Sequence, residues 1–221
     1  MPLPKHDLPL YTHFLKGINK EVQFRPFTGK EQKILLLAKQ SEDEREMLDA
    51  MKQVVDMCMQ TKVKRLPIFD FEDIFLRIRS KSVSESTQMH YRHKDTGEKF
   101  VVDVDLRDVE VKDGGVDKVI YFSDTYGVEM RYPTIDSYKL NEDDYILDCI
   151  QSVFKDDEVE SFQDYSKDEQ MEWIESLDLP MLNKIDHFLK NLPVLMYERE
   201  VELESKEKVK ITLKGLQDFF Y

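Results

Sequence analysis

The sequence predicts an α+β protein rather than an α/β protein, and two observations lead to this class. Apolar residues recur at helical spacing toward both ends of the chain, whereas the middle switches to the alternation typical of strands. The helical and strand segments are also grouped along the chain, which argues against a parallel sheet with crossover helices. We therefore expect amphipathic helices, a small central antiparallel sheet and a C-terminal β-hairpin.

The composition is that of a folded protein whose acidity is concentrated in one segment. The 221 residues are 41% hydrophobic and carry a formal net charge of −13. Residues 140–178 contain 14 Asp and Glu but only two Lys, so this segment supplies most of that charge. Because nucleic-acid backbones are bound by clustered Lys and Arg, we expect no nucleic-acid partner.

Residues 1–86 are expected to hold an extended arm followed by helices. The prolines and the run EVQFRPF within residues 1–27 indicate an arm with one short strand. Thr28 then has the character of a helix N-cap, and Glu31 three residues later completes a capping box.

A second helix is expected to open at Ser41, because Glu44 repeats the capping-box spacing. Its buried stripe comprises apolar residues at helical spacing, namely Met47, Met51, Val54, Val55 and Cys58. Cys58 and Cys149 both lie in apolar patterns, which indicates free buried thiols in a reducing compartment.

The third helix combines an acidic start with a basic end. Asp70 is its expected N-cap, and Asp73 with Arg77 forms an i, i+4 pair that stabilises a helix by about 0.2–0.5 kcal/mol. Its core stripe is expected to be Phe71, Ile74, Phe75 and Ile78. Arg77, Arg79 and Lys81 complement the negative end of the helix macrodipole. We interpret them as a helix end, and an anion site is the alternative.

Residues 87–138 are expected to form an antiparallel β module. In the run KFVVDVDL every second residue is apolar, which is the spacing of a strand with one solvated face. A second pair of strands, VIYFS and VEMRY, is joined by the turn DTYG.

Residues 139–193 are expected to form an acidic helical region. A helix is predicted from Asn141, with an apolar stripe of Ile146, Leu147, Ile150, Val153 and Phe154. Ser166 and Glu169 form a further capping box. The run LPMLNKIDHFLKNLP predicts one more helix, bounded by prolines.

Residues 194–221 are expected to form a β-hairpin followed by an aromatic tail. The runs VLMYEREVEL and KVKITL alternate as hairpin strands do. Chain ends normally fray, so the apolar tail residues must dock on their own domain or on a partner. The four segments are compatible with one integrated core or with two.

No constellation of residues marks a catalytic or metal site. His90 and His93 form a close pair, but residues three apart on a strand point to opposite faces. Asp186 precedes His187, which flanks the apolar stripe of a helix and is expected to be a partly buried structural histidine. No G-x-S-x-G elbow surrounds a serine. We expect no enzymatic activity, no cofactor and no small-molecule substrate, with a small hydrolase as the alternative from another class.

Targeting signals are not expected either. No apolar run is long enough for a signal peptide or a membrane span. We therefore expect a protein of the cytosol with no membrane partner.

Three blocks of the chain resemble the baseplate protein family of T-even-like contractile-tailed bacteriophages. The first is YTHFLKGINKEVQFRPFTGKEQKILLLAKQSEDE, with its Arg-Pro-Phe, short spacer and Lys-Glu. The second is DFEDIFLRIRSKSVSE. The third combines IDHFLKNLPVL with ITLKGLQDFFY. These blocks occur in the order of the family and are spread over most of the chain.

The resemblance implies a non-enzymatic late protein that acts in assembly of the baseplate hub through contacts with other hub proteins. The family includes assembly factors, or chaperones, and structural hub subunits, and the blocks do not distinguish these roles. The expected place of action is the host cytoplasm during phage assembly, or the virion baseplate for a subunit. Together with the aromatic tail, the blocks give the candidate partner contacts Arg25, Phe27, Lys30, Arg77, Arg79, Lys81, Leu216, Phe219, Phe220 and Tyr221.

One departure from the family concerns zinc. Some relatives carry paired cysteines in the central hairpin, where this chain has MHYRHKDTGEKF. We therefore expect no bound metal.

Overall fold

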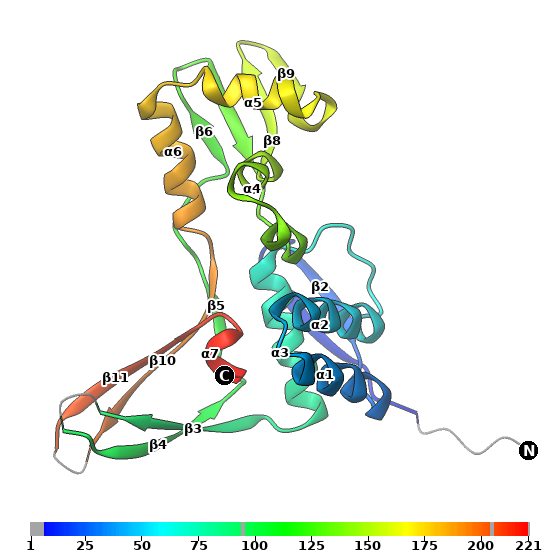
Figure 1. The fold of residues 1–221 in the computed structure, drawn as a ribbon, viewed down its shortest axis with the longest axis vertical. Coiled ribbons are helices and arrows are strands. Elements are labelled where there is room, and N and C mark those ends of the chain that lie inside the picture. The colour runs from blue at the N-terminus through cyan, green and yellow to red at the C-terminus, as the bar shows by residue number, and fades with distance from the viewer. Residues whose placement is uncertain (1–6, 94–95, 204–205, 221) are drawn as a thin grey trace, which may run out of the picture. The chain divides into compact units, whose positions relative to one another are not determined.

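The chain divides into two units, which are described separately (Figure 1). The computed structural model describes residues 7–93, 96–203 and 206–220. Unit 1 comprises residues 1–112 and 194–221, and unit 2 comprises residues 113–193. Unit 2 is thus inserted between β5 (Glu110–Lys112) and β10 (Val194–Glu202), which are hydrogen-bonded neighbours in unit 1. The mixed α+β class is confirmed.

Unit 1 is built around α3 (Ile68–Ser82), which is buried on almost every side. Its fully or almost fully buried apolar side chains include Phe69, Ile74, Leu76 and Ile78. The helix packs against β1 (Tyr11–Leu15), α2 (Glu44–Cys58), β5 and β10. A helix buried all round must also pair its polar side chains, because an unpaired buried polar group is costly.

The arm before the first helix is a β-hairpin, whereas the sequence predicted one strand. Strand β1 runs antiparallel to β2 (Lys20–Phe24). Asp70 was expected to cap α3, but the residue before the helix is Pro67, and Asp70 lies inside it. Its carboxylate accepts the backbone N–H groups of Gly17 and Ile18, each at 2.9 Å. The expected N-cap is therefore a buried anchor for the hairpin turn.

Helix α1 (Gly29–Ser41) has the predicted capping box, but the box predicted for α2 is wrong. The N-cap of α2 is Asp43, whose carboxylate accepts two backbone N–H groups of the first turn. Ser41 still belongs to α1, and its hydroxyl donates to the carbonyl oxygen of Ala38. The C-cap residue after α1 is Glu42, whose φ of 56° is left-handed.

The strands predicted between residues 87 and 138 are present, but they belong to two separate sheets, and β5, which the sequence did not predict, belongs to a third. Strands β3 (Ser86–Arg92) and β4 (Lys99–Asp105) form a hairpin of their own. Strand β5 joins β10 and β11 (Lys208–Lys214), and the remaining two strands belong to unit 2. Alternation identifies a strand and its faces, but strand order depends on contacts that are distant in sequence.

The C-terminal hairpin is confirmed. Strand β10 pairs antiparallel with β11, and the short helix α7 (Gln217–Phe220) follows. In the described part of the chain, no helix has both the length and the apolar character that crossing a membrane requires.

Unit 2 is a four-stranded antiparallel sheet with helices on one face. The strand order is β6 (Val119–Tyr121), β7 (Tyr126–Met130), β8 (Ile150–Lys155) and β9 (Glu158–Ser161). The helical elements are η1 (Ile135–Lys139), α4 (Glu142–Asp148), η2 (Phe162–Asp164), α5 (Lys167–Glu175) and α6 (Leu179–Lys190). The core between sheet and helices is formed by Val128, Met130, Leu147, Cys149, Ile150, Phe162, Leu177, Ile185 and Phe188.

The helix predicted from Asn141 is shorter than expected. Helix α4 ends at Asp148, and residues 150–161, which were expected to be part of an acidic helical region, form β8 and β9. The apolar residues of this stretch fit a helical stripe by spacing alone. The sequence IQSVFK also supports a strand, because β-branched and aromatic residues favour pleated surfaces. Pairing with β7 decides the outcome.

Candidate interaction surfaces

The residues weighed in the sequence as metal ligands lie in unit 1, apart from the residues weighed as a general base, which lie in unit 2. No three or more His, Cys, Asp and Glu side chains in the described ranges are arranged to hold a metal ion. His90 lies in β3 and His93 just beyond its end. Asp186 pairs with Lys190 at 2.7 Å. His187 is exposed on α6, so the prediction of a partly buried structural histidine is wrong.

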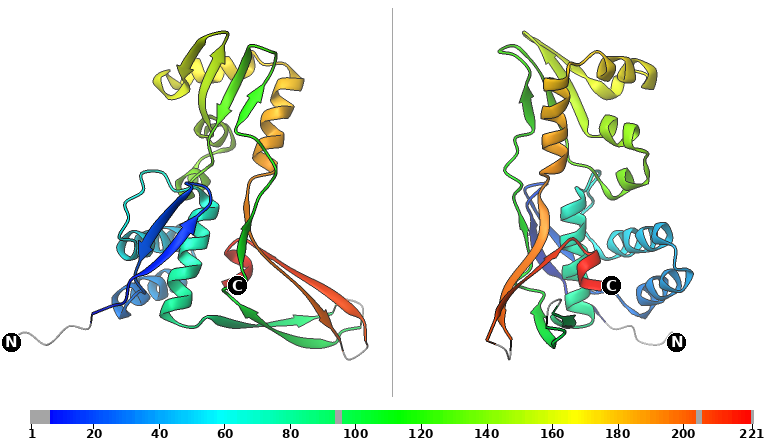
Figure 2. Two further views of the ribbon diagram at one scale, coloured as in Figure 1. Left: turned by 180° about the vertical axis from the view of Figure 1, so that it is seen from behind. Right: turned by 60° about the vertical axis from the view of Figure 1, so that its left-hand side comes forward.

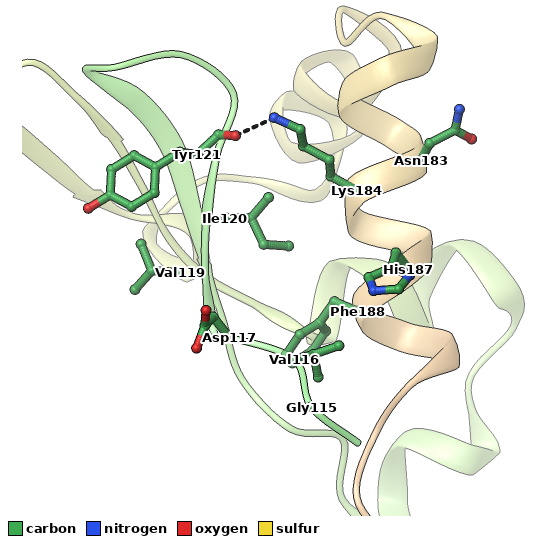
Figure 3. A pocket seen from close by; sticks show the side chains of 10 residues that line it. All are labelled: Gly115, Val116, Asp117, Val119, Ile120, Tyr121, Asn183, Lys184, His187 and Phe188. Atoms are coloured by element: carbon green, nitrogen blue, oxygen red, sulfur yellow. Dashed lines mark hydrogen bonds between the residues drawn. The ribbon is translucent and has the colours of Figure 1, made fainter. Parts of the chain in front are cut away.

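His187 lines a shallow hollow of about 450 Å³ between β6 and α6 (Figure 3). Lys184 donates from Nζ to the backbone carbonyl oxygen of Tyr121 at 2.6 Å across this hollow. Ile120 points toward α6, whereas Val119 and Tyr121 point away from it (Figure 3). Lys184 of α6 is therefore hydrogen-bonded to β6, which is an edge strand of the unit 2 sheet.

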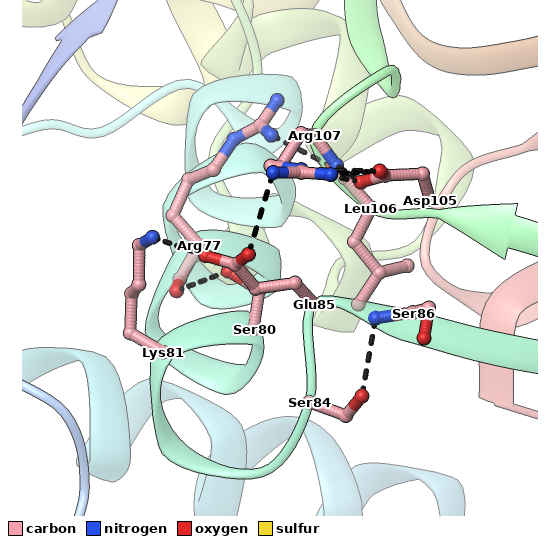
Figure 4. A network of polar contacts seen from close by, with 9 residues as sticks. All are labelled: Arg77, Ser80, Lys81, Ser84, Glu85, Ser86, Asp105, Leu106 and Arg107. Carbon is pink, nitrogen blue, oxygen red and sulfur yellow. Dashed lines mark hydrogen bonds and ion pairs between the residues drawn. The ribbon is translucent and has the colours of Figure 1, made fainter.

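The basic run of α3 is used within unit 1, as shown for Arg77 in Figure 4. Arg77 Nε donates to Asp73 Oδ1 at 2.9 Å, and its Nη1 donates to the carbonyl oxygen of Leu106 at 2.7 Å. Nη2 donates to the carbonyl oxygen of Val109. Asp73 also lies 2.6 Å from Nε2 of His13. These contacts make Arg77 a clamp between α3 and the segment after β4, and the predicted Asp73–Arg77 pair is confirmed.

Lys81 begins a chain of alternating charges on the surface of the same unit (Figure 4). It pairs with Glu85, and its Nζ lies 5.1 Å from the ring centroid of Tyr11. Glu85 lies 3.6 Å from Arg107, which pairs with Asp105 at 2.5 Å. Such exposed pairs contribute little to stability.

Arg25 is also held inside unit 1. Its Nη2 donates to Glu31 Oε1 at 2.9 Å and to the carbonyl oxygen of Met57 at 3.0 Å. Burial disfavours ionisation of Glu31, but hydrogen bonds from Arg25 and Thr28 lower its pKa to about 2. Burial raises the pKa of the neighbouring Cys58 thiol to about 11, so this thiol stays protonated at neutral pH.

The other candidate contacts of the N-terminal blocks differ in exposure. Phe27 is half-buried, and its backbone N–H donates to Ser82 Oγ at 2.8 Å. Lys30 is exposed at the start of α1. Burial lowers the pKa of Arg79, which is half-buried on α3. Lys30 is thus the candidate of this group whose head group is most open to solvent.

The aromatic tail docks on its own unit at the positions that can be described. Leu216 and Phe219 are both buried. The backbone N–H of Leu216 donates to Glu72 Oε1 at 3.2 Å. Phe220 lies in α7, and Tyr221 is outside the described residues.

The sequence did not predict an exposed apolar row on the outer face of the unit 2 sheet. Tyr121, Gly127, Phe154 and Val159 lie side by side on the four strands. The rings of Tyr121 and Phe154 are 5.3 Å apart and meet edge to face over the glycine. Tyr121 is 57% exposed and Val159 is 69% exposed. The sequence predicted VIYFS as a strand, but not that one of its faces is open.

The net charge belongs entirely to unit 2. It contains 20 Asp and Glu against seven Lys and Arg, a net charge of −13, whereas unit 1 contains 25 of each sign. Most acids of residues 140–178 are exposed. The acidic segment identified from sequence is therefore part of one structural unit.

Comparison with known proteins gives one match. The family model described as T4 bacteriophage base plate protein matches residues 8–221. No curated protein and no solved structure matches the chain.

Proposed function

The chain belongs to the T4 bacteriophage base plate protein family, and from this premise we propose that it is a non-enzymatic assembly factor of the baseplate hub. In this role it binds other hub proteins in the host cytoplasm and brings them into the hub. It uses no cofactor and acts on no small-molecule substrate.

The observation that carries this proposal is the family match over residues 8–221, which spans both structural units. One further feature supports a role based on contacts. Unit 2 joins an exposed apolar row to a surface of strong negative charge, and such surfaces are suited to partner proteins.

A structural hub subunit is the second candidate, because the same family match supports it. Quantitative mass spectrometry of purified tails and of infected-cell extracts separates the two roles. An assembly factor is present in the extract during hub formation and absent from purified tails. If purified tails contained a fixed number of copies of the chain, it would be a structural subunit and not an assembly factor.

Co-expression tests the contact-based function itself. Each other baseplate protein of the same phage is produced with an affinity tag, together with this chain. We expect at least one of them to retain the chain on the affinity resin. If none does, the chain has no direct role in hub contacts and the proposal is wrong.

A further inference from the structure

We infer that β9 of unit 2 is a docking edge that accepts an extended, basic segment of another baseplate protein as a fifth strand. The inference rests on the proposed function and deepens it, because it assigns the contact to one strand and the partner to one chemical class.

The first argument is the position of β9 at the end of its sheet. Figure 2 shows β9 at one margin of the sheet and β6 beside α6 at the other. Strand β9 pairs with β8 on one side, and no strand of the described residues pairs with its other side. A free edge presents backbone N–H and C=O groups to solvent, which is a template for a further strand.

The two edges of this sheet are not equivalent. At β6, Lys184 donates to the carbonyl oxygen of Tyr121 and thereby uses an acceptor of that edge. Lysine at a sheet edge also discourages strand addition. The four residues of β9 are Glu158, Val159, Glu160 and Ser161, and all of them are exposed. Strand addition is therefore favoured at β9.

The second argument is the apolar row on the outer face. Val159 pairs with Phe154, so it continues the row of Tyr121 and Phe154 to the margin of the sheet. An added strand points every second side chain to this face. An apolar side chain of the partner would then pack beside Val159, which is 69% exposed without it.

The third argument is charge, and it selects the partner. Glu158 and Glu160 lie on the same face of β9 because they are two residues apart, and both are exposed. Glu160 accepts a hydrogen bond from the Tyr165 hydroxyl at 3.1 Å, which leaves its negative charge without a cation. Two further acids, Asp156 and Asp157, precede the strand. Like charges on adjacent strands are destabilising, so the β9 edges of two copies repel each other. Lys or Arg at alternate positions of an incoming strand would instead pair with the two glutamates.

The test compares two double variants with the same change in charge. In Glu158→Lys/Glu160→Lys the reversed charges lie on β9, whereas in Glu172→Lys/Glu175→Lys they lie on the exposed face of α5. Binding to the baseplate protein that retains the wild-type chain is measured for both variants at low and moderate salt. Circular dichroism shows whether each variant is folded.

We expect the β9 variant to bind at least about tenfold more weakly and the α5 variant to stay within about threefold of the wild type. If both variants bound more weakly by the same factor, the loss would reflect general attraction between opposite charges rather than docking at β9, and the inference would be overturned. If the β9 variant bound the baseplate protein as tightly as the wild type does, the inference would be overturned as well, while the proposed function would stand.

Hydrogen exchange on the wild-type chain tests the same inference without any substitution. Hydrogen exchange is followed with and without the bound baseplate protein. We expect the amides of residues 158–161 to gain protection while those of residues 119–121 do not. Lack of protection at residues 158–161, or pairing of β9 with a second copy of this chain, would contradict the inference. Failure of every baseplate protein to bind would reject the proposed function first.

Discussion

The carboxylate of Asp70 accepts the backbone N–H of Gly17 at 2.9 Å, although 53 residues separate them in sequence. The other carboxylate oxygen accepts the N–H of Ile18, so both oxygens serve the turn between β1 and β2. Asp70 is 0% exposed. Burial raises its pKa, against the effect of the two N–H donors. The turn and the buried side of α3 therefore depend on each other.

Gly17→Ala is expected to destabilise unit 1, because an added Cβ has no room. It would lie 2.6 Å from Asp70 Oδ2 and 2.6 Å from the ring of Phe69. Overpacking of this kind costs about 1–3 kcal/mol in the free energy of unfolding. The measurement is urea unfolding followed by circular dichroism. Gly29→Ala is the control, because its Cβ would meet nothing within 4 Å. Equal losses in the two variants would show that the close approach to Asp70 does not matter.

Arg77→Lys is expected to lower the free energy of unfolding by about 1–3 kcal/mol. Lysine keeps the positive charge near Asp73, but its ammonium cannot also reach the carbonyl oxygens of Leu106 and Val109 as the guanidinium does. Arg107→Lys changes an exposed arginine in the same way and is expected to leave stability unchanged. If Arg77→Lys is as stable as the wild type, the contacts of Arg77 with Leu106 and Val109 do not hold unit 1 together.

Glu72→Gln is expected to make the protein more stable at pH 8 than the wild type. Burial raises the pKa of Glu72 from 4.5 to about 7, against the hydrogen bond from the N–H of Leu216. Because the carboxyl group of Glu72 binds its proton more tightly in the folded wild type than in the unfolded chain, protonation stabilises the folded state. This stabilisation is complete below pH 4.5 and is lost as the pH rises through 7. The advantage of the variant over the wild type should therefore grow by about 3 kcal/mol between pH 4.5 and pH 8.

Urea unfolding of both proteins at pH 4.5, 6 and 8 measures this difference. Glu172→Gln removes an exposed carboxylate of α5 and serves as the control. An advantage of Glu72→Gln that is the same at all three values would show that Glu72 is not the titrating group.

The sequence predicted local structure well where a local pattern decides it. The capping boxes at Thr28 and Ser166 and the hairpin of β10 and β11 follow from neighbouring residues, and all are confirmed. Predictions failed where distant contacts decide. Asp70 has the sequence context of an N-cap, but its partners lie in a turn 53 residues earlier. Residues 150–155 fit a helix by spacing and become a strand through pairing with β7.

The candidate surfaces also divide into features that the sequence alone reveals and features that depend on the fold. The acidity of residues 140–178 was visible in the sequence, because charge is counted without knowing the fold. The row of Tyr121, Phe154 and Val159 was not visible, since its members come from three strands whose order only the fold defines. The roles of Arg25 and Arg77 were also hidden, because their acceptors include backbone carbonyl groups that carry no sequence signal.

Phe219→Ala is expected to lower the free energy of unfolding by about 3–5 kcal/mol, since truncating a buried aromatic side chain leaves a cavity. Phe219 is buried in unit 1, whereas Gln217 in the same helix is exposed, so Gln217→Ala is the matched control. Deletion of residues 216–221 also removes the buried Leu216 and its hydrogen bond to Glu72, so it should reduce soluble yield before any partner is tested. Urea unfolding of the two point variants and soluble yield of the deletion measure these effects. If Phe219→Ala retained wild-type stability and lost only partner binding, the tail would be a contact surface and its docking on unit 1 would have no structural role.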